Sequence, residues 1–128
     1  MDTRVIETRK TVSIVQRVNL TSEFNVSINN VPFIPDEVIV KSIFYDPDIA
    51  ENRIGIIYLD LVSDIIGCFY EVQHNITGPH FILNKPVKGT YKFQIFTGEN
   101  IPDATRVGNF LIVLDFVKYK EVKEGKIY

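Results

Sequence analysis

The clearest pattern in the sequence is an alternation of hydrophobic positions with a period of two. Its longest instance, residues 110–119, contains no glycine or proline and is rich in β-branched and aromatic residues, a composition typical of a strand. Because successive side chains of a strand point to opposite faces of a sheet, one face carries Phe110, Ile112, Leu114 and Phe116, and the other carries Leu111, Val113, Asp115, Val117 and Tyr119. Both faces are largely apolar, which predicts a central strand.

The same criteria predict a series of shorter strands before it. They are expected over residues 11–18, 24–28, 37–45, 54–62, 68–72, 81–83 and 90–96. Turn-forming segments such as Asn29-Asn30-Val31-Pro32 and Asp46-Pro47-Asp48 separate them, since Asn, Asp and Pro favour turns. A single helical turn is expected over residues 63–67, closed by Gly67.

About eight short strands and no amphipathic helix of three turns predict an all-β fold. We expect a single β-sandwich, with the jelly roll as its eight-strand form. An immunoglobulin-like sandwich is the alternative, although the sequence has no Trp and no pair of cysteines, which usually mark that fold. The predicted core comprises Val38, Val40, Phe44, Ile56, Tyr91, Phe93, Ile95, Ile112, Leu114 and Phe116.

The 128 residues are most simply one domain with a short extension at each end. Residues 1–10 have mixed charge and no strong periodicity, which indicates an N-terminal arm. Residues 11–119 form the predicted β-sandwich domain, and residues 120–128 form a charged C-terminal tail.

Composition excludes several classes of protein. The formal net charge of −2 argues against a direct nucleic-acid binder, which normally carries a basic excess. No apolar run approaches the roughly 20 residues of a membrane-spanning helix, and the polar first residues are unlike a signal peptide. Cys68 is the only cysteine, so no disulfide forms within the chain. We therefore expect a soluble, intracellular protein.

Candidate metal ligands are few. Cys68, His74 and His80 are each separated by five residues, which matches no compact zinc pattern. A second group, Asp46, Asp48 and Glu51, lies in one loop as calcium ligands do, but the glycine and the regular oxygen spacing of an EF-hand are missing. We expect no metal and no other cofactor.

Catalytic motifs are also missing from the sequence. It has no Gly-x-Ser-x-Gly elbow, no local Cys/His signature and no glycine-rich phosphate loop. A carboxylate pair for sugar hydrolysis could be drawn from Asp60, Asp64, Glu71 and Asp115. However, Asp60 and Asp115 lie late in otherwise apolar strands, where solvation at a strand end or a hydrogen bond to a turn explains them equally well. The prediction is that the protein is not an enzyme and has no catalytic residues.

Surplus apolar residues are the one feature that points to a function. Outer faces of a sandwich are normally polar, so additional hydrophobic surface indicates an interface. We infer an outward-facing set of Leu111, Val113 and Val117 beside Ile57 and Leu59. The arm adds Arg4, Val5 and Ile6, and the tail adds Val122, Ile127 and Tyr128. These residues predict a homo-oligomer or docking to other proteins.

Four segments resemble one group of proteins. They are Pro35-Asp36-Glu37-Val38-Ile39-Val40-Lys41-Ser42-Ile43, Ile57-Tyr58-Leu59-Asp60-Leu61-Val62-Ser63-Asp64, Gly89-Thr90-Tyr91-Lys92-Phe93 and Gly108-Asn109-Phe110-Leu111-Ile112. Together they resemble the small jelly-roll structural proteins of large DNA viruses and virophages, over about residues 35–119. The resemblance implies a minor capsid or capsid-associated protein that is made in the host cytoplasm, is located in the virion and binds other capsid proteins. It implies no catalytic residues for this chain.

A carbohydrate-binding, lectin-like module is the alternative function. Jelly rolls serve as lectins, and the strand aromatics Phe44, Phe69, Tyr70, Tyr91 and Phe93 could form a sugar platform. The acidic loop with Asp46, Asp48 and Glu51 could then hold calcium beside a bound glycan.

Overall fold

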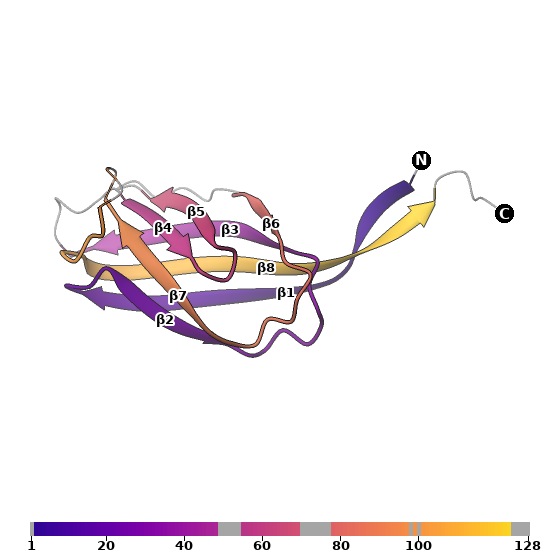
Figure 1. Ribbon diagram of the computed structural model, residues 1–128, viewed down its shortest axis with the longest axis horizontal. Helices are drawn as coiled ribbons and strands as arrows, with labels where there is room; N and C mark the ends of the chain where they lie inside the picture. The colour runs from indigo at the N-terminus through magenta and orange to yellow at the C-terminus, as the bar shows by residue number, and fades with distance from the viewer. Residues whose placement is uncertain (1, 49–54, 70–77, 98, 100, 124–128) are drawn as a thin grey trace.

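The computed structural model describes residues 2–48, 55–69, 78–97, 99 and 101–123. These residues form eight strands and no helix: β1 (Asp2–Asn19), β2 (Glu23–Ile28), β3 (Glu37–Pro47), β4 (Gly55–Leu59), β5 (Asp64–Phe69), β6 (His80–Ile82), β7 (Gly89–Phe96) and β8 (Val107–Lys123). Two four-stranded antiparallel sheets result, with the orders β1-β8-β3-β6 and β2-β7-β4-β5, and they lie in two layers (Figure 1). The predicted all-β sandwich is confirmed.

The strands pair as though the chain were first folded into one long hairpin. β4 pairs with its sequence neighbour β5, and the pairs further out are β3 with β6, β2 with β7 and β1 with β8. Contacts between β3 and β8 join two of these pairs into the first sheet, and contacts between β4 and β7 join the other two into the second. Strands from opposite ends of the chain therefore lie side by side.

The predicted central strand is β8, which pairs with β1 on one edge and β3 on the other. Four of its alternate residues face the second sheet and are at most 1% exposed: Phe110, Ile112, Leu114 and Phe116. In the second sheet, Phe24 stacks on its cross-strand partner Phe93 with ring centroids 5.1 Å apart. Across the sandwich, the Phe24 ring lies 6.0 Å from the ring of Phe110 in β8. A continuous apolar core thus fills the space between the layers.

A β-bulge in β3 reverses the predicted orientation of the residues that follow it. Val38 and Val40 are buried as expected, but Lys41 has no partner in the pairing with β8. One additional residue shifts the alternation by one position. As a result Ile43 and Tyr45 enter the core, and Phe44, which we predicted in the core, lies on the other face and is half-buried.

A similar correction applies to β4. The sequence is apolar on both faces of this strand, and we placed Ile56 inside with Ile57 and Leu59 outside. In the structure Ile57 and Leu59 are fully buried, and Ile56 is half-buried on the opposite side. Tyr91 of β7, another predicted core residue, is also half-buried, and it packs against the edge of the core.

The connection between β4 and β5 is a tight turn, so the predicted helical turn over residues 63–67 is wrong. Backbone hydrogen bonds from Val62 N to Leu59 O and from Ser63 N to Asp60 O close the turn. Ser63 has a φ of 53°, which places it in the left-handed region often found in turns. β5 then begins at Asp64, and the chain is extended where a helical turn was expected.

Most of the predicted arm continues the first strand. β1 begins at Asp2, not at Thr11, and its first half pairs with the end of β8 from Asp2 opposite Lys123 to Lys10 opposite Phe116. This two-stranded ribbon projects beyond the sandwich (Figure 1). The part of the predicted tail that is described, residues 120–123, belongs to β8, so arm and tail form one unit.

Candidate interaction surface

The outer face of the first sheet, turned away from the second sheet, carries an apolar row across three strands. In the register, Val15 of β1 lies opposite Leu111 of β8, and Leu111 lies opposite Phe44 of β3. Val15 is 77% and Leu111 37% exposed, whereas Phe44 is half-buried. A shallow groove of about 470 Å³ runs along this row and includes Asp46 and Asn109 in its lining.

The local sequence explains why three apolar side chains meet here. Val15 and Leu111 occupy the outward positions of their strands, and the bulge at Lys41 turns Phe44 to the same side. Val113, in the next outward position of β8, is half-buried and extends the row. Leu111 and Val113 therefore lie where the sequence predicts them.

An exposed ion pair borders one side of the apolar row. Arg17 of β1 donates hydrogen bonds to both carboxylate oxygens of Asp48. These hydrogen bonds lower the pKa of Asp48 below its ordinary value and raise the pKa of Arg17. Because Arg17 already engages Asp48, that carboxylate is a poor calcium ligand; Glu51, the third member of the predicted acidic loop, lies outside the described residues.

A buried carboxylate borders the other side. Asp115 of β8 is only 3% exposed on the outer face, where it accepts a hydrogen bond from the Thr11 hydroxyl. The Nε atom of Arg9 lies 3.6 Å from its Oδ2 atom. Since a buried carboxylate needs partners of this kind, Asp115 has a structural role that ties β1 to β8.

Beyond Asp115 lies a group of charged and aromatic residues, the Glu37 cluster (Arg4, Glu37, His80 and Tyr119). The Glu37 carboxylate accepts a 2.9 Å hydrogen bond from the Tyr119 hydroxyl and lies 3.3 Å from His80 Nδ1. The Arg4 guanidinium is 3.7 Å from the same carboxylate and stacks over the Tyr119 ring. Burial and the Glu37 carboxylate raise the pKa of Tyr119, although Arg4 acts in the opposite direction.

The remaining predicted interface residues fall into four groups. Ile57 and Leu59 lie in the core and cannot form a surface, so that prediction is wrong. Val117 is on the outer face but is fully buried, between Arg9 of β1 and Glu37 of β3 in the register. Arg4, Val5 and Ile6 are exposed on the ribbon. The side chain of Val122, and residues Ile127 and Tyr128, are outside what the structure describes.

Of the carboxylates considered for catalysis, Asp60 and Asp64 lie at one turn, whereas Asp115 lies in the other sheet. Asp60 accepts a hydrogen bond from Lys92 N, and Asp64 from its neighbour Ile65 N, at the turn of the β4–β5 hairpin. Glu71 is outside the described residues. Among the residues described, no group of three metal-binding side chains comes together; His74 is not among them.

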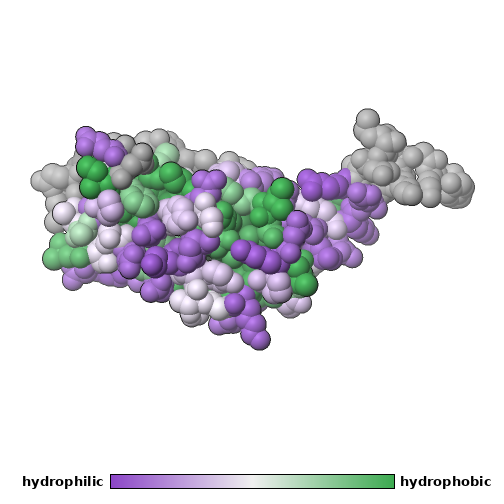
Figure 2. Space-filling model, viewed as in Figure 1, coloured by the Kyte–Doolittle hydropathy of each residue, from purple (hydrophilic) through white to green (hydrophobic). Residues whose placement is uncertain are grey.

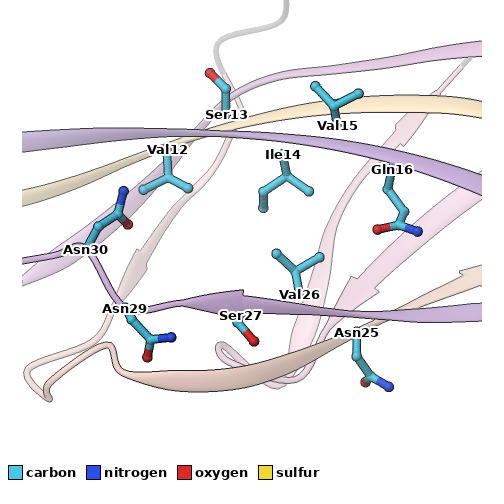
Figure 3. A pocket seen from close by; sticks show the side chains of 10 residues that line it. All are labelled: Val12, Ser13, Ile14, Val15, Gln16, Asn25, Val26, Ser27, Asn29 and Asn30. Carbon is cyan, nitrogen blue, oxygen red and sulfur yellow. The ribbon is translucent and has the colours of Figure 1, made fainter.

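An uncharged groove separates β1 from β2, the two edge strands on one side of the sandwich (Figure 3). It has a volume of about 600 Å³. Val12, Ile14 and Val26 point toward one another across it (Figure 3). Its remaining lining is mostly amides and hydroxyls: Ser13, Gln16, Asn25, Ser27, Asn29 and Asn30. Of the predicted sugar-platform aromatics, Phe69 and Phe93 are buried in the core and cannot contact a ligand.

A second apolar surface lies at the end of the sandwich from which the ribbon leaves (Figure 2). Its most exposed residues are Ile34, 53% exposed before β3, and Ile82, 75% exposed in β6. A groove of about 350 Å³ beside Ile34 is lined by Phe33 and Val87 among others. The sequence analysis did not single out these residues, because each lies in or beside a short loop without periodicity.

A buried ion pair is the principal feature that sequence reasoning missed. Arg106 and Asp103 are 2% and 5% exposed, and Nε of Arg106 lies 2.7 Å from Oδ2 of Asp103. Burial alone raises the pKa of Asp103, but hydrogen bonds from Thr105 and the Arg106 charge outweigh it and hold the pKa below its ordinary value. The guanidinium also lies 5.0 Å from the Phe69 ring centre. The pair anchors the loop before β8 to the core.

Comparisons with known proteins add no family to this description. No protein-family model matches the chain, and no curated protein sequence is significantly similar to it. In the part of the chain that the structure describes, no helix has the length and apolar character to cross a membrane.

Proposed function

We propose that the protein is a non-enzymatic structural subunit, a minor capsid or capsid-associated component of a virion, that acts by self-association and by docking to other capsid proteins. The observation that carries this proposal is the apolar row of Val15, Leu111 and Phe44 on the outer face of the first sheet. Exposed apolar groups on a sheet face are favourable to bury at ~25 cal/mol per Å², and they are typical of an interaction surface.

The winding of the chain supports the same proposal. Nested pairing of β1 with β8, β2 with β7, β3 with β6 and β4 with β5 is the arrangement expected of a jelly roll, in which one long hairpin is rolled into two sheets. The jelly roll is common in viral capsid proteins, and the resemblance of residues 35–119 to such proteins points the same way.

The surroundings of the apolar row suit a specific contact. Charged groups lie at both sides of it, namely the Arg17–Asp48 pair on one side and Asp115 with Arg9 on the other. Charges at the rim of an interface contribute to orientation and partner choice more than to affinity. The apolar row and the charged groups beside it therefore have the composition of an interface core with a polar rim.

Lysine substitutions in the apolar row should strongly reduce association through this surface without unfolding the protein. In the double variant Val15→Lys/Leu111→Lys, a partner that binds the row would have to bury two lysine charges, and removing these charges from water is unfavourable. Light scattering at increasing concentration should show a rising apparent mass for the wild type and a much lower mass for the variant. Ile101→Lys, at a 54% exposed residue in a loop outside the row, is the matched control. A wild type that stays monomeric and binds no capsid protein would refute the proposal.

Carbohydrate binding is the second candidate, and the groove between β1 and β2 favours it. Neutral amides such as those of Asn25, Asn29 and Gln16 can hydrogen-bond to sugar hydroxyls, while the half-buried Val26 offers apolar contact.

A glycan array measures carbohydrate binding directly. If this second function holds, the wild type should bind a defined set of glycans, and Asn25→Ala should lose most of that binding. Asn19→Ala, at an exposed residue of β1 outside the groove, serves as the control. An array without any bound glycan would remove this candidate.

A further inference from the structure

The projecting ribbon has one free edge that is suited to pairing. β1 is an edge strand of its sheet, and among the described strands only β8 pairs with it. In the ribbon Val5 is 38% and Ile6 40% exposed. The ribbon stands clear of the sandwich (Figure 1), so its edge can be approached by another molecule. Unpaired backbone N–H and C=O groups on such an edge are a template for a further strand.

The other edge of the ribbon is protected. Beyond Val117, β8 has no pairing with β3, but the Tyr119 N–H donates a 2.8 Å hydrogen bond to the Asp36 carboxylate. Lys118, Lys120 and Lys123 also lie along this part of β8. Lysines on an edge strand oppose strand addition. The segment of β1 from Asp2 to Arg9 contains no lysine, so β1 provides the open edge.

The pairing with β8 assigns the residues of β1 to the two faces of the ribbon. Ile6 lies opposite Tyr119, and Arg4 shares that face because its guanidinium stacks over the Tyr119 ring. Val5 lies on the reverse face. Glu7 is the additional residue of a β-bulge, since the register shifts between Ile6 and Thr8. After the bulge, Arg9 lies opposite Val117 and returns to the face of Arg4.

We infer that β1 pairs antiparallel with β1 of a second copy of this chain, about a two-fold axis through Val5. This inference rests on the proposed assembly function and names one contact through which it operates. Antiparallel strands place residues of the same face opposite one another, and a two-fold axis makes the contact identical from both sides. Val5 then faces the partner's Val5, and Arg4 faces the partner's Ile6 with the partner's Glu7 beside it. After the bulge, Thr8 faces the partner's Thr3, and Arg9 faces the partner's Asp2.

Charge selects this register over its neighbours. The Val5-centred register sets Arg4 near a glutamate and Arg9 opposite an aspartate. Centring the axis on Ile6 would instead place Arg4 opposite the partner's Arg9, and like charges directly opposite are destabilising. Centring it on Thr8 would leave Arg9 opposite Ile6 without an acidic partner. Of these three registers, the one through Val5 is the one that gives both Arg4 and Arg9 an acidic neighbour on the partner.

The geometry also avoids a collision between the two sandwiches. The contact ends at Arg9, where β3 begins to pair with β8 and the sandwich starts, and antiparallel pairing directs the two sandwiches to opposite ends of the shared ribbon. Two marginal two-stranded ribbons become one four-stranded sheet, a size at which sheets gain stability of their own. Because each copy contributes only a short segment, we expect the pairing to depend on concentration.

Cysteine crosslinking tests the register directly. In a Cys68→Ser background, Val5→Cys places two thiols at the two-fold axis, where facing Cα atoms lie about 4.5–5.5 Å apart, within disulfide range. Mild oxidation of the full chain should convert most of this variant to a covalent dimer. Thr8→Cys is the matched control on the same ribbon, because its two copies would lie more than about 10 Å apart along the strands.

The outcomes separate this inference from the proposed function. Crosslinking of Val5→Cys and not of Thr8→Cys supports pairing about Val5. Equal crosslinking of both variants, or of neither, overturns it. Efficient crosslinking of a Val15→Cys variant with none through Val5 would leave self-association through the apolar row intact and reject the ribbon contact. Far-UV circular dichroism of the reduced proteins checks that each variant retains the wild-type fold, and light scattering checks its mass.

Discussion

Replacing Arg106 by alanine is expected to lower the free energy of unfolding by ~3–5 kcal/mol, because it leaves the Asp103 carboxylate buried without its charged partner. Asp103 is 5% exposed and Arg106 2%. The substitution also removes the guanidinium that lies over the rings of Tyr45 and Phe69. Chemical denaturation followed by far-UV circular dichroism measures the change.

The exposed pair of Arg17 and Asp48 is the matched control for this experiment. It joins the same two residue types on the surface, where solvent screens the interaction. Arg17→Ala should therefore change the denaturation midpoint far less than Arg106→Ala. Equal midpoints for the two variants would mean that the buried pair has no special role in stability.

A second large effect is expected at Phe110, where replacement by alanine should cost ~3–5 kcal/mol of stability, as for other large-to-small aromatic changes in a core. Its ring stacks on Tyr45 at 4.4 Å and meets the edge of Phe69 at 5.1 Å. Removing it leaves a cavity between the sheets. Thermal and urea denaturation report the loss.

Leu111, the next residue of β8, provides a control within the same strand. Leu111 points to the outer face and is 37% exposed, so Leu111→Ala should cost about 1 kcal/mol or less. If Leu111→Ala were as damaging as Phe110→Ala, the assignment of faces in β8 would be wrong.

The alternation of hydrophobic residues predicts much of this fold because a strand has only two faces. In β8 one face is uniformly apolar, and the sequence alone identifies both its central position and its core residues. β4 defeats the same reasoning because Ile56 and Ile57 are both apolar, so either register satisfies the pattern. In β3 the bulge at Lys41 leaves no mark in the composition, and it exchanges the faces of Phe44 and Tyr45.

The candidate surface was predictable only in part, for a related reason. Leu111 and Val113 follow from the outward face of β8, but their neighbours across the sheet depend on strand order, which the sequence does not reveal. Val15 and Phe44 therefore entered the apolar row only once the register was known. Arg106 was unpredictable because a lone arginine in a loop normally remains in solvent.

The nested pairing of the strands has a consequence for how the chain folds. β8 follows the other seven strands in the sequence, yet it lies between β1 and β3 and must be in place before the first sheet can close. The hydrogen bond from Thr11 to Asp115, for example, joins residues 104 positions apart. Only the β4–β5 hairpin is local enough to form early, and domains dominated by such distant pairings fold slowly. During synthesis, both edges of β1 therefore remain unpaired until β8 has been made and pairs with one of them.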